Sequence, residues 1–183
     1  MTKLNSILVL LAAFLAVFLE TAFSGLRHLL GAQIDLLPAL VVYASLCTGL
    51  TTMAFVAVLG GLLFDSLSAN PLGVTVLPLF VVGFLIYLQR GLILRDQTFA
   101  QLVLGLGASA AVPVLTVLLL LTKGQTPLLG WGSLWQWIVM ALGGAVMTPA
   151  LFKLFGFLER ALSYHHATEA SFRPDREIRR GRK

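Results

Sequence analysis

The chain has 183 residues, of which 58% are hydrophobic and 11% are charged, and its mean hydropathy is +0.92. Soluble domains carry about 25% charged residues, so this composition excludes an ordinary soluble protein and indicates a polytopic membrane protein. The net charge of +5 comes mostly from the C-terminal residues, which points to a membrane face rather than to nucleic acid. The single cysteine, Cys47, excludes an intrachain disulfide and a CxxC site, and we interpret it as a small packing residue.

Six transmembrane helices are expected, because a helix crosses the hydrocarbon with about 20 residues. The apolar run after Lys3 also resembles a signal peptide, but no clear cleavage site follows, so an uncleaved first helix is expected. Residues 36–64 lack any charge and are too long for one comfortable span, so a central polar cluster divides them into two helices. One tilted helix is the alternative. The expected helices cover residues 4–23, 34–48, 50–67, 72–88, 99–122 and 134–158.

Six spans place both termini on one side of the membrane. All but two of the 13 Lys and Arg residues, Arg27 and Lys123, then fall on that side. The positive-inside rule therefore predicts a multi-pass protein with its N-terminus and C-terminus inside. Residues 1–158 form the expected transmembrane domain, and residues 159–183 form an expected disordered, basic cytoplasmic tail. That tail would bind anionic lipid or a cytosolic protein.

The segment that carries most information runs from Gly60-Gly61 to Gly73. Between residues 36 and 89 the only formal charge is Asp65, and a charge in so apolar a setting is costly unless it has a partner or a function. One expectation is a structural clasp, in which Asp65 bonds across the turn to Ser68 and Asn70 or to free amides of the next helix. The other is a direct contact with a ligand or a partner protein.

Local signals predict where that next helix starts. Asn70 is the expected N-cap, and Pro71 would stand in the first turn, where its missing N–H costs nothing. At other helix ends, Glu20 lies seven residues before Arg27 and is a candidate ion-pair partner. Asp35 is the expected N-cap of the second helix.

Small residues and prolines mark the expected helix contacts. Pairs of small residues four apart allow helix backbones to approach closely, and the pairs we single out are Ala12/Ala16, Ala57/Gly61, Gly105/Ser109 and Ala141/Ala145. Internal prolines at positions 78, 113 and 149 should kink their helices. Three tryptophans, at positions 131, 135 and 137, are expected to anchor the chain at the outer membrane interface.

The sequence favours a protein that is not an enzyme. Its three histidines, at positions 28, 165 and 166, lie in polar connections or the tail, and no HExxH, GxSxG, Ser–Lys pair or acidic cluster stands within the expected helices. Asp65 with Ser68 lacks an orienting base. We therefore expect no catalytic residues, no metal and no cofactor.

Residues 35–90 contain four characteristic strings: Asp35-Leu-Leu-Pro-Ala-Leu, Gly60-Gly61-Leu-Leu-Phe-Asp65, Ser68-x-x-Pro71-Leu72-Gly73, and Gly83-Phe-Leu before Arg90. In these strings the chain resembles the MreD family, the small integral-membrane component of the bacterial rod-shape system. The family often has proline before the aspartate that opens the second helix, and here Ile34 takes that place.

The resemblance implies a non-catalytic scaffold or regulatory subunit of the elongasome in the bacterial cytoplasmic (inner) membrane. It implies binding to MreC, proximity to RodA and a class B penicillin-binding protein, and an indirect link to the MreB filament, in support of lateral peptidoglycan synthesis. The family is also similar to the six-helix substrate-binding subunits of energy-coupling-factor transporters. The alternative function is therefore a small-molecule (vitamin-like) binding subunit. The residues expected at the partner site or clasp are Gly60, Gly61, Asp65, Ser68, Asn70, Pro71 and Gly73, with Glu20, Arg27 and Asp35 secondary.

Overall fold

The protein is all-helical over the part described by a computed structural model, residues 3–22, 34–68, 71–93, 97–124 and 130–169. These residues form six helices and no strand, which confirms the all-helical part of the expected fold class. The chain divides into two compact units, residues 1–152 and 153–183. The helices are α1 (Lys3–Ala22), α3 (Leu37–Cys47), α4 (Leu50–Leu67), α5 (Val76–Gln89), α6 (Thr98–Thr122) and α7 (Trp131–Glu169).

Three segments among the described residues are long and apolar enough to cross a membrane: Leu50–Leu67, Thr98–Thr122 and Trp131–Ala161. The other apolar helical segments are shorter. At 11 residues, α3 is about 16 Å long, roughly half of the ~30 Å hydrocarbon thickness. The helices therefore have the character of a membrane protein, and three of them have the length for a full crossing.

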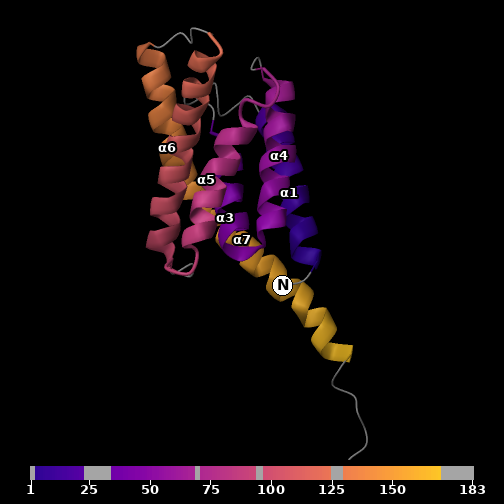
Figure 1. Ribbon diagram of the computed structural model, residues 1–183. Helices are drawn as coiled ribbons and strands as arrows, with labels where there is room; N and C mark the ends of the chain where they lie inside the picture. The colour runs from indigo at the N-terminus through magenta and orange to yellow at the C-terminus, as the bar shows by residue number, and fades with distance from the viewer. Residues whose placement is uncertain (1–2, 23–33, 69–70, 94–96, 125–129, 170–183) are drawn as a thin grey trace, which may run out of the picture. The chain divides into compact units, whose positions relative to one another are not determined.

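The short helix α3 forms the centre of the first unit. It contacts α1, α4, α5 and α6, and these helices lie around it in Figure 1. All its residues from Leu37 to Leu46 are buried, whereas Cys47 at its end is half-buried. A helix that is apolar on every side belongs in an interior, which explains why α3 lies inside although it is too short to span. In the C-terminal half of α3, the Tyr43 ring packs edge-on against the Phe152 ring, with 5.0 Å between the ring centroids.

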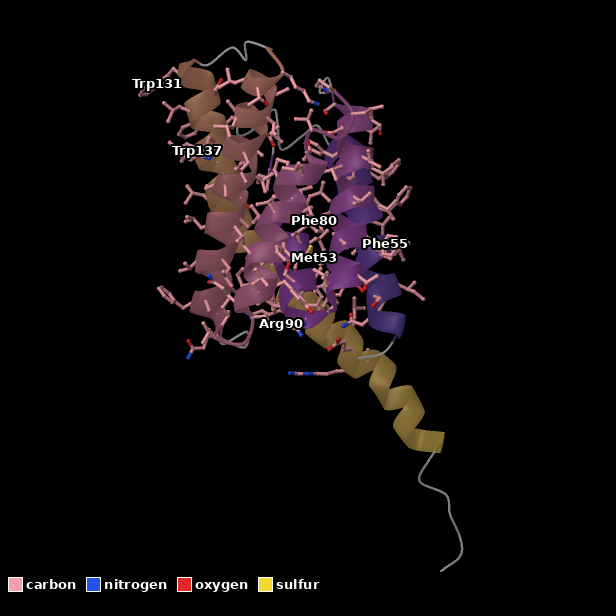
Figure 2. All side chains as sticks on the ribbon, in the orientation of Figure 1. Met53, Phe55, Phe80, Arg90, Trp131 and Trp137 are labelled. Carbon is pink, nitrogen blue, oxygen red and sulfur yellow. The ribbon has the colours of Figure 1, made fainter. Side chains whose placement is uncertain are left out.

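Two adjacent glycines let α4 pack closely against both of its neighbours. A Cβ atom on Gly60 would lie 2.7 Å from the Leu37 side chain of α3. A Cβ atom on Gly61 would lie 3.0 Å from the backbone of Val76 at the start of α5. On the inner side of α4, Met53 is fully buried, whereas Phe55 points outward (Figure 2). The Gly60-Gly61 string is therefore a packing device on two faces of one helix.

A second close contact joins α6 to α7. A Cβ atom on Gly105 would lie 2.6 Å from the carbonyl oxygen of Gly144, and Thr148 is as close. The Ser109 side chain lies against Gly144 in the same way. The expected pair Gly105/Ser109 thus lies at a helix–helix contact, and its counterpart on α7 is Gly144/Thr148. We name these four residues the α6–α7 seam.

The start of α5 differs from the expectation. The helix begins at Val76 and not at residue 72, so neither Asn70 as N-cap nor Pro71 in the first turn is correct. The N-cap is Thr75. Gly73 has a φ of 86°, a left-handed conformation that a right-handed helix cannot include. The later start also places Pro78 in the first turn of α5, where its missing N–H breaks no helical bond and no kink is needed.

The last helix is longer at both ends than the expected 134–158. It starts at Trp131, so the tryptophans form its first two turns, and it continues to Glu169. No proline or glycine lies between Gly156 and Glu169, so nothing in the sequence stops the helix at residue 158. Residues 170–183 lie outside the described part, and their disorder stays a prediction. Pro113 and Pro149 stand inside α6 and α7, as expected.

Candidate functional site

The Asp65 carboxylate joins the end of α4 to the start of α5. Its side chain is 1% exposed in the last turn of α4. Oδ2 accepts a hydrogen bond from the Thr75 backbone N–H at 3.1 Å, and Oδ1 accepts one from the Thr75 hydroxyl. Both oxygens of the buried carboxylate therefore have a donor from one residue, ten positions along the chain. We call this pair the Asp65–Thr75 clasp.

The clasp resolves an electrostatic conflict. A carboxylate in the last turn of α4 lies at the negative end of that helix dipole, which is unfavourable. The same carboxylate lies at the start of α5, whose free N–H groups and positive dipole end favour a negative charge. Thr75, the N-cap of α5, makes no side-chain cap bond of its own. Asp65 thus caps α5 from a different helix.

The turn between the two helices is shaped for this bond. The Ser68 hydroxyl donates to the Asp65 carbonyl oxygen at 3.3 Å, and the Val74 N–H donates to the Pro71 carbonyl oxygen at 3.3 Å. Gly73, in its left-handed conformation, reverses the chain between them. Ser68, Pro71 and Gly73 therefore build the turn that brings Thr75 to Asp65. Asn70 lies outside the described residues.

The secondary candidates gather at the start of α3. The Leu36 N–H donates to Glu20 Oε1, and the Leu37 N–H donates to Asp35 Oδ1 at 2.9 Å. The N-cap of α3 is Leu36, so the expectation that Asp35 is the N-cap is wrong. Asp35 lies one position earlier and still accepts a hydrogen bond from an amide in the first turn. Glu20 and Asp35 therefore both accept hydrogen bonds from backbone amides at the start of α3.

The expected Glu20–Arg27 ion pair stays untested, because Arg27 lies outside the described residues. The other Glu20 oxygen, Oε2, is buried and has no hydrogen-bond partner in the described part of the chain. The structure shows instead a hydrogen bond between two helices: Glu20, near the end of α1, accepts from the backbone N–H of Leu36 at the start of α3.

Sequence reasoning missed Thr75. Its signal was present, because Thr75 is the one hydroxyl-bearing or charged residue between Pro71 and Tyr87, in a run that is otherwise apolar. A threonine in an apolar run and an aspartate at the end of the preceding apolar helix are a candidate pair, since each needs a partner away from water. The ten-residue separation hid it, because neither a helical nor a strand period links positions 65 and 75.

The clasp leaves apolar side chains at its outer surface. Leu72 in the turn is 69% exposed, and Leu67 in the last turn of α4 is also exposed. Asp65 itself is buried, whereas Ser66 beside it is exposed. We name the two exposed leucine side chains, Leu67 and Leu72, which flank the clasp in the chain, the Leu67–Leu72 surface.

Among the described residues no group of three or more His, Cys, Asp or Glu side chains could hold a metal ion. The carboxylates of Asp65 and Asp35 are engaged with the backbone of helix starts. Comparison of the chain with protein-family models, characterised proteins and solved structures found no match.

Proposed function

We propose that this protein is a non-catalytic membrane scaffold of the MreD type, a subunit of the bacterial elongasome that binds MreC. In this role it supports lateral peptidoglycan synthesis near RodA and a class B penicillin-binding protein, and it links indirectly to the MreB filament. It acts as a six-span protein of the cytoplasmic membrane with both termini inside. The observation that carries the proposal is the Asp65–Thr75 clasp, because it gives the string that resembles the family a single physical purpose.

The residues of that string support a scaffold. Gly60 and Gly61 allow α4 to approach α3 and α5, and Asp65 fixes the start of α5. Gly73 reverses the chain so that the clasp can close. These are the properties of a rigid platform, and a scaffold needs a surface of fixed shape more than it needs reactive groups.

The Leu67–Leu72 surface is the proposed contact with MreC. It is apolar and exposed, and the clasp beneath it holds its backbone. A single-pass partner helix would pack against such a surface through van der Waals contacts. Loss of the clasp would then weaken the complex indirectly, through displacement of the leucines.

The alternative, a vitamin-binding transporter subunit, needs a cavity with several convergent polar groups. The groove between α6 and α7 has an apolar lining with only two polar side chains, Ser133 and Gln136. This groove does not supply such a set of polar groups. The same purification experiment separates the two.

The test is purification of the tagged full-length protein from its own host in a gentle detergent, with mass spectrometry of the proteins and small molecules that accompany it. We expect MreC, together with RodA or a penicillin-binding protein. Recovery of a transmembrane coupling subunit with paired ATPases, or of a tightly bound vitamin-sized molecule, would replace the proposal with the transporter alternative.

Matched variants locate the contact. Leu72→Asn should reduce recovery of MreC, whereas Leu92→Asn should leave it unchanged, because Leu92 is 87% exposed but follows the other end of α5. Asp65→Ala should also reduce recovery while the protein stays folded. Equal recovery with Leu72→Asn and Leu92→Asn would exclude the Leu67–Leu72 surface as the contact.

A further inference from the structure

A groove of about 640 Å³ runs between α6 and α7. On α6 its wall extends from Pro113 to Leu121, and on α7 from Gly130 to Met140. The α6–α7 seam, where Ser109 and Gly144 are in close contact, lies further along the two helices, beyond the groove. The Trp137 indole N–H donates to the Ala110 carbonyl oxygen at 2.9 Å and ties the two helices together between the groove and the seam.

The dimensions of the groove suit a hydrocarbon chain. From Pro113 to Leu121 it covers eight helical rises, about 12 Å, against the ~15 Å depth of one hydrocarbon leaflet. A transmembrane helix with its side chains is at least ~10 Å wide, so a 12 Å length of it fills roughly 900 Å³ and would lie only partly inside. A lipid tail is one methylene wide and can lie fully inside along the apolar wall.

The groove also reaches Gly130 at the start of α7, on the side away from the seam. Of the two polar side chains in the lining, Ser133 lies in the first turn of α7, whereas Gln136 lies beside Trp137. Gly130 places the N-terminus of α7 at this end, where free backbone N–H groups and the positive dipole end attract anions. Lys123 lies two residues beyond Leu121 at the same end and is exposed. Trp131 and Trp137 stand on these turns of α7 (Figure 2).

We propose that the α6–α7 groove is a binding site for one phosphate-bearing lipid. The tail lies between Pro113 and Leu121 on α6 and Leu134 and Met140 on α7. The phosphate lies at the start of α7 and within reach of the Lys123 ammonium group. Charge complementarity at one end and an apolar wall along the rest select an anionic lipid over a zwitterionic one. The site does not depend on the elongasome role.

The tryptophans make the site directly observable. All three tryptophans of the chain lie in residues 131–137, so intrinsic fluorescence reports on this part of α7. A Trp131→Phe/Trp135→Phe variant keeps only Trp137, which lines the groove. The full-length protein is reconstituted in phosphatidylcholine vesicles that contain a small, equal fraction of tail-brominated phosphatidylglycerol or tail-brominated phosphatidylcholine. Bromine quenches tryptophan only at close range.

Brominated phosphatidylglycerol should quench Trp137 more strongly than brominated phosphatidylcholine at equal fraction. Lys123→Gln should lower that preference about fivefold, which corresponds to about 1 kcal/mol for one basic residue near an anionic headgroup. Lys123→Arg should preserve it. Val117→Phe fills the groove and should abolish the preference, whereas Val103→Phe adds the same ring to an exposed α6 position outside the groove and should not.

Three results would overturn the proposal. Equal quenching by the two lipids would mean ordinary contact with the surrounding bilayer. An unchanged preference in Val117→Phe would place the lipid elsewhere, and Val114→Phe, a second groove variant, serves if Val117→Phe does not fold. Absence of quenching by either lipid would mean that protein, such as a second copy of the chain, covers the groove.

Discussion

Asp65 and Thr75 are ten residues apart, and one carboxylate binds both the backbone N–H and the hydroxyl of one threonine. This relationship couples the end of α4 to the start of α5, whose own N-cap residue makes no side-chain cap bond. Breaking this pair is costly, because removal of either the carboxylate or its donors leaves a buried polar group with neither water nor a hydrogen-bond partner.

Asp65→Ala should lower the free energy of unfolding by about 2–3 kcal/mol, because it leaves the buried Thr75 N–H and hydroxyl without their charged acceptor. Thr75→Val should cost about 1 kcal/mol, since the N–H bond stays. The double variant should be no less stable than Asp65→Ala alone, because the two changes remove one shared interaction.

The measurement for this pair is equilibrium unfolding in mixed detergent micelles, followed by circular dichroism. Ser66→Ala is the matched control, because Ser66 is exposed and bonds only to the Leu63 carbonyl within its own helix. Its effect should stay within about 0.5 kcal/mol. Additive effects of Asp65→Ala and Thr75→Val would show that the two residues act independently and would contradict the clasp.

Gly61→Ala should destabilise the protein by about 1–3 kcal/mol through overpacking, because the new methyl group meets the Val76 backbone, which cannot rotate away. Gly60→Ala should cost less, since its methyl group meets only the end of the Leu37 side chain. The thermal unfolding midpoints of the two variants in one detergent decide the order. A larger loss for Gly60→Ala would contradict the packing of α4 described above.

Gly105→Ala tests the α6–α7 seam. Its methyl group would meet the Gly144 carbonyl oxygen and Thr148, so we expect a loss of about 1–3 kcal/mol. Gly107→Ala, two residues along the same helix, meets nothing within 4 Å and should be neutral or stabilising by up to about 1 kcal/mol, because alanine favours the helix. The measurement is the thermal unfolding midpoint of the two variants in one detergent. Equal midpoints for Gly105→Ala and Gly107→Ala would exclude the close contact.

Glu20→Leu should reduce stability by about 1–2 kcal/mol, because the Leu36 N–H at the start of α3 loses its acceptor. Glu20→Gln should cost less, since its amide oxygen can still accept that bond. Both are read from thermal unfolding at neutral pH. A glutamine variant as unstable as the leucine variant would contradict a role for this hydrogen bond in stability.

The sequence by itself determined the helical class and most helix positions. The expected third helix, 50–67, matches α4, and the expected first and fifth helices differ from α1 and α6 by one residue at most at each end. Charges, glycines and prolines mark the ends of long apolar runs, so length and composition suffice there. The pair Gly105/Ser109 was also visible, because small residues four apart share one helix face.

The tertiary structure decided what those residues contact. In a uniformly apolar chain the hydrophobic period is weak, so the sequence could not show that α3 is the interior helix. Local signals at Asn70 and Pro71 favoured an earlier start for α5, but the turn at Gly73 and the bond to Asp65 moved the start to Val76. Asp65 required a partner on physical grounds, and only the folding of α4 against α5 brought Thr75 to it, because a hydrogen bond depends on position in space and not on separation in sequence.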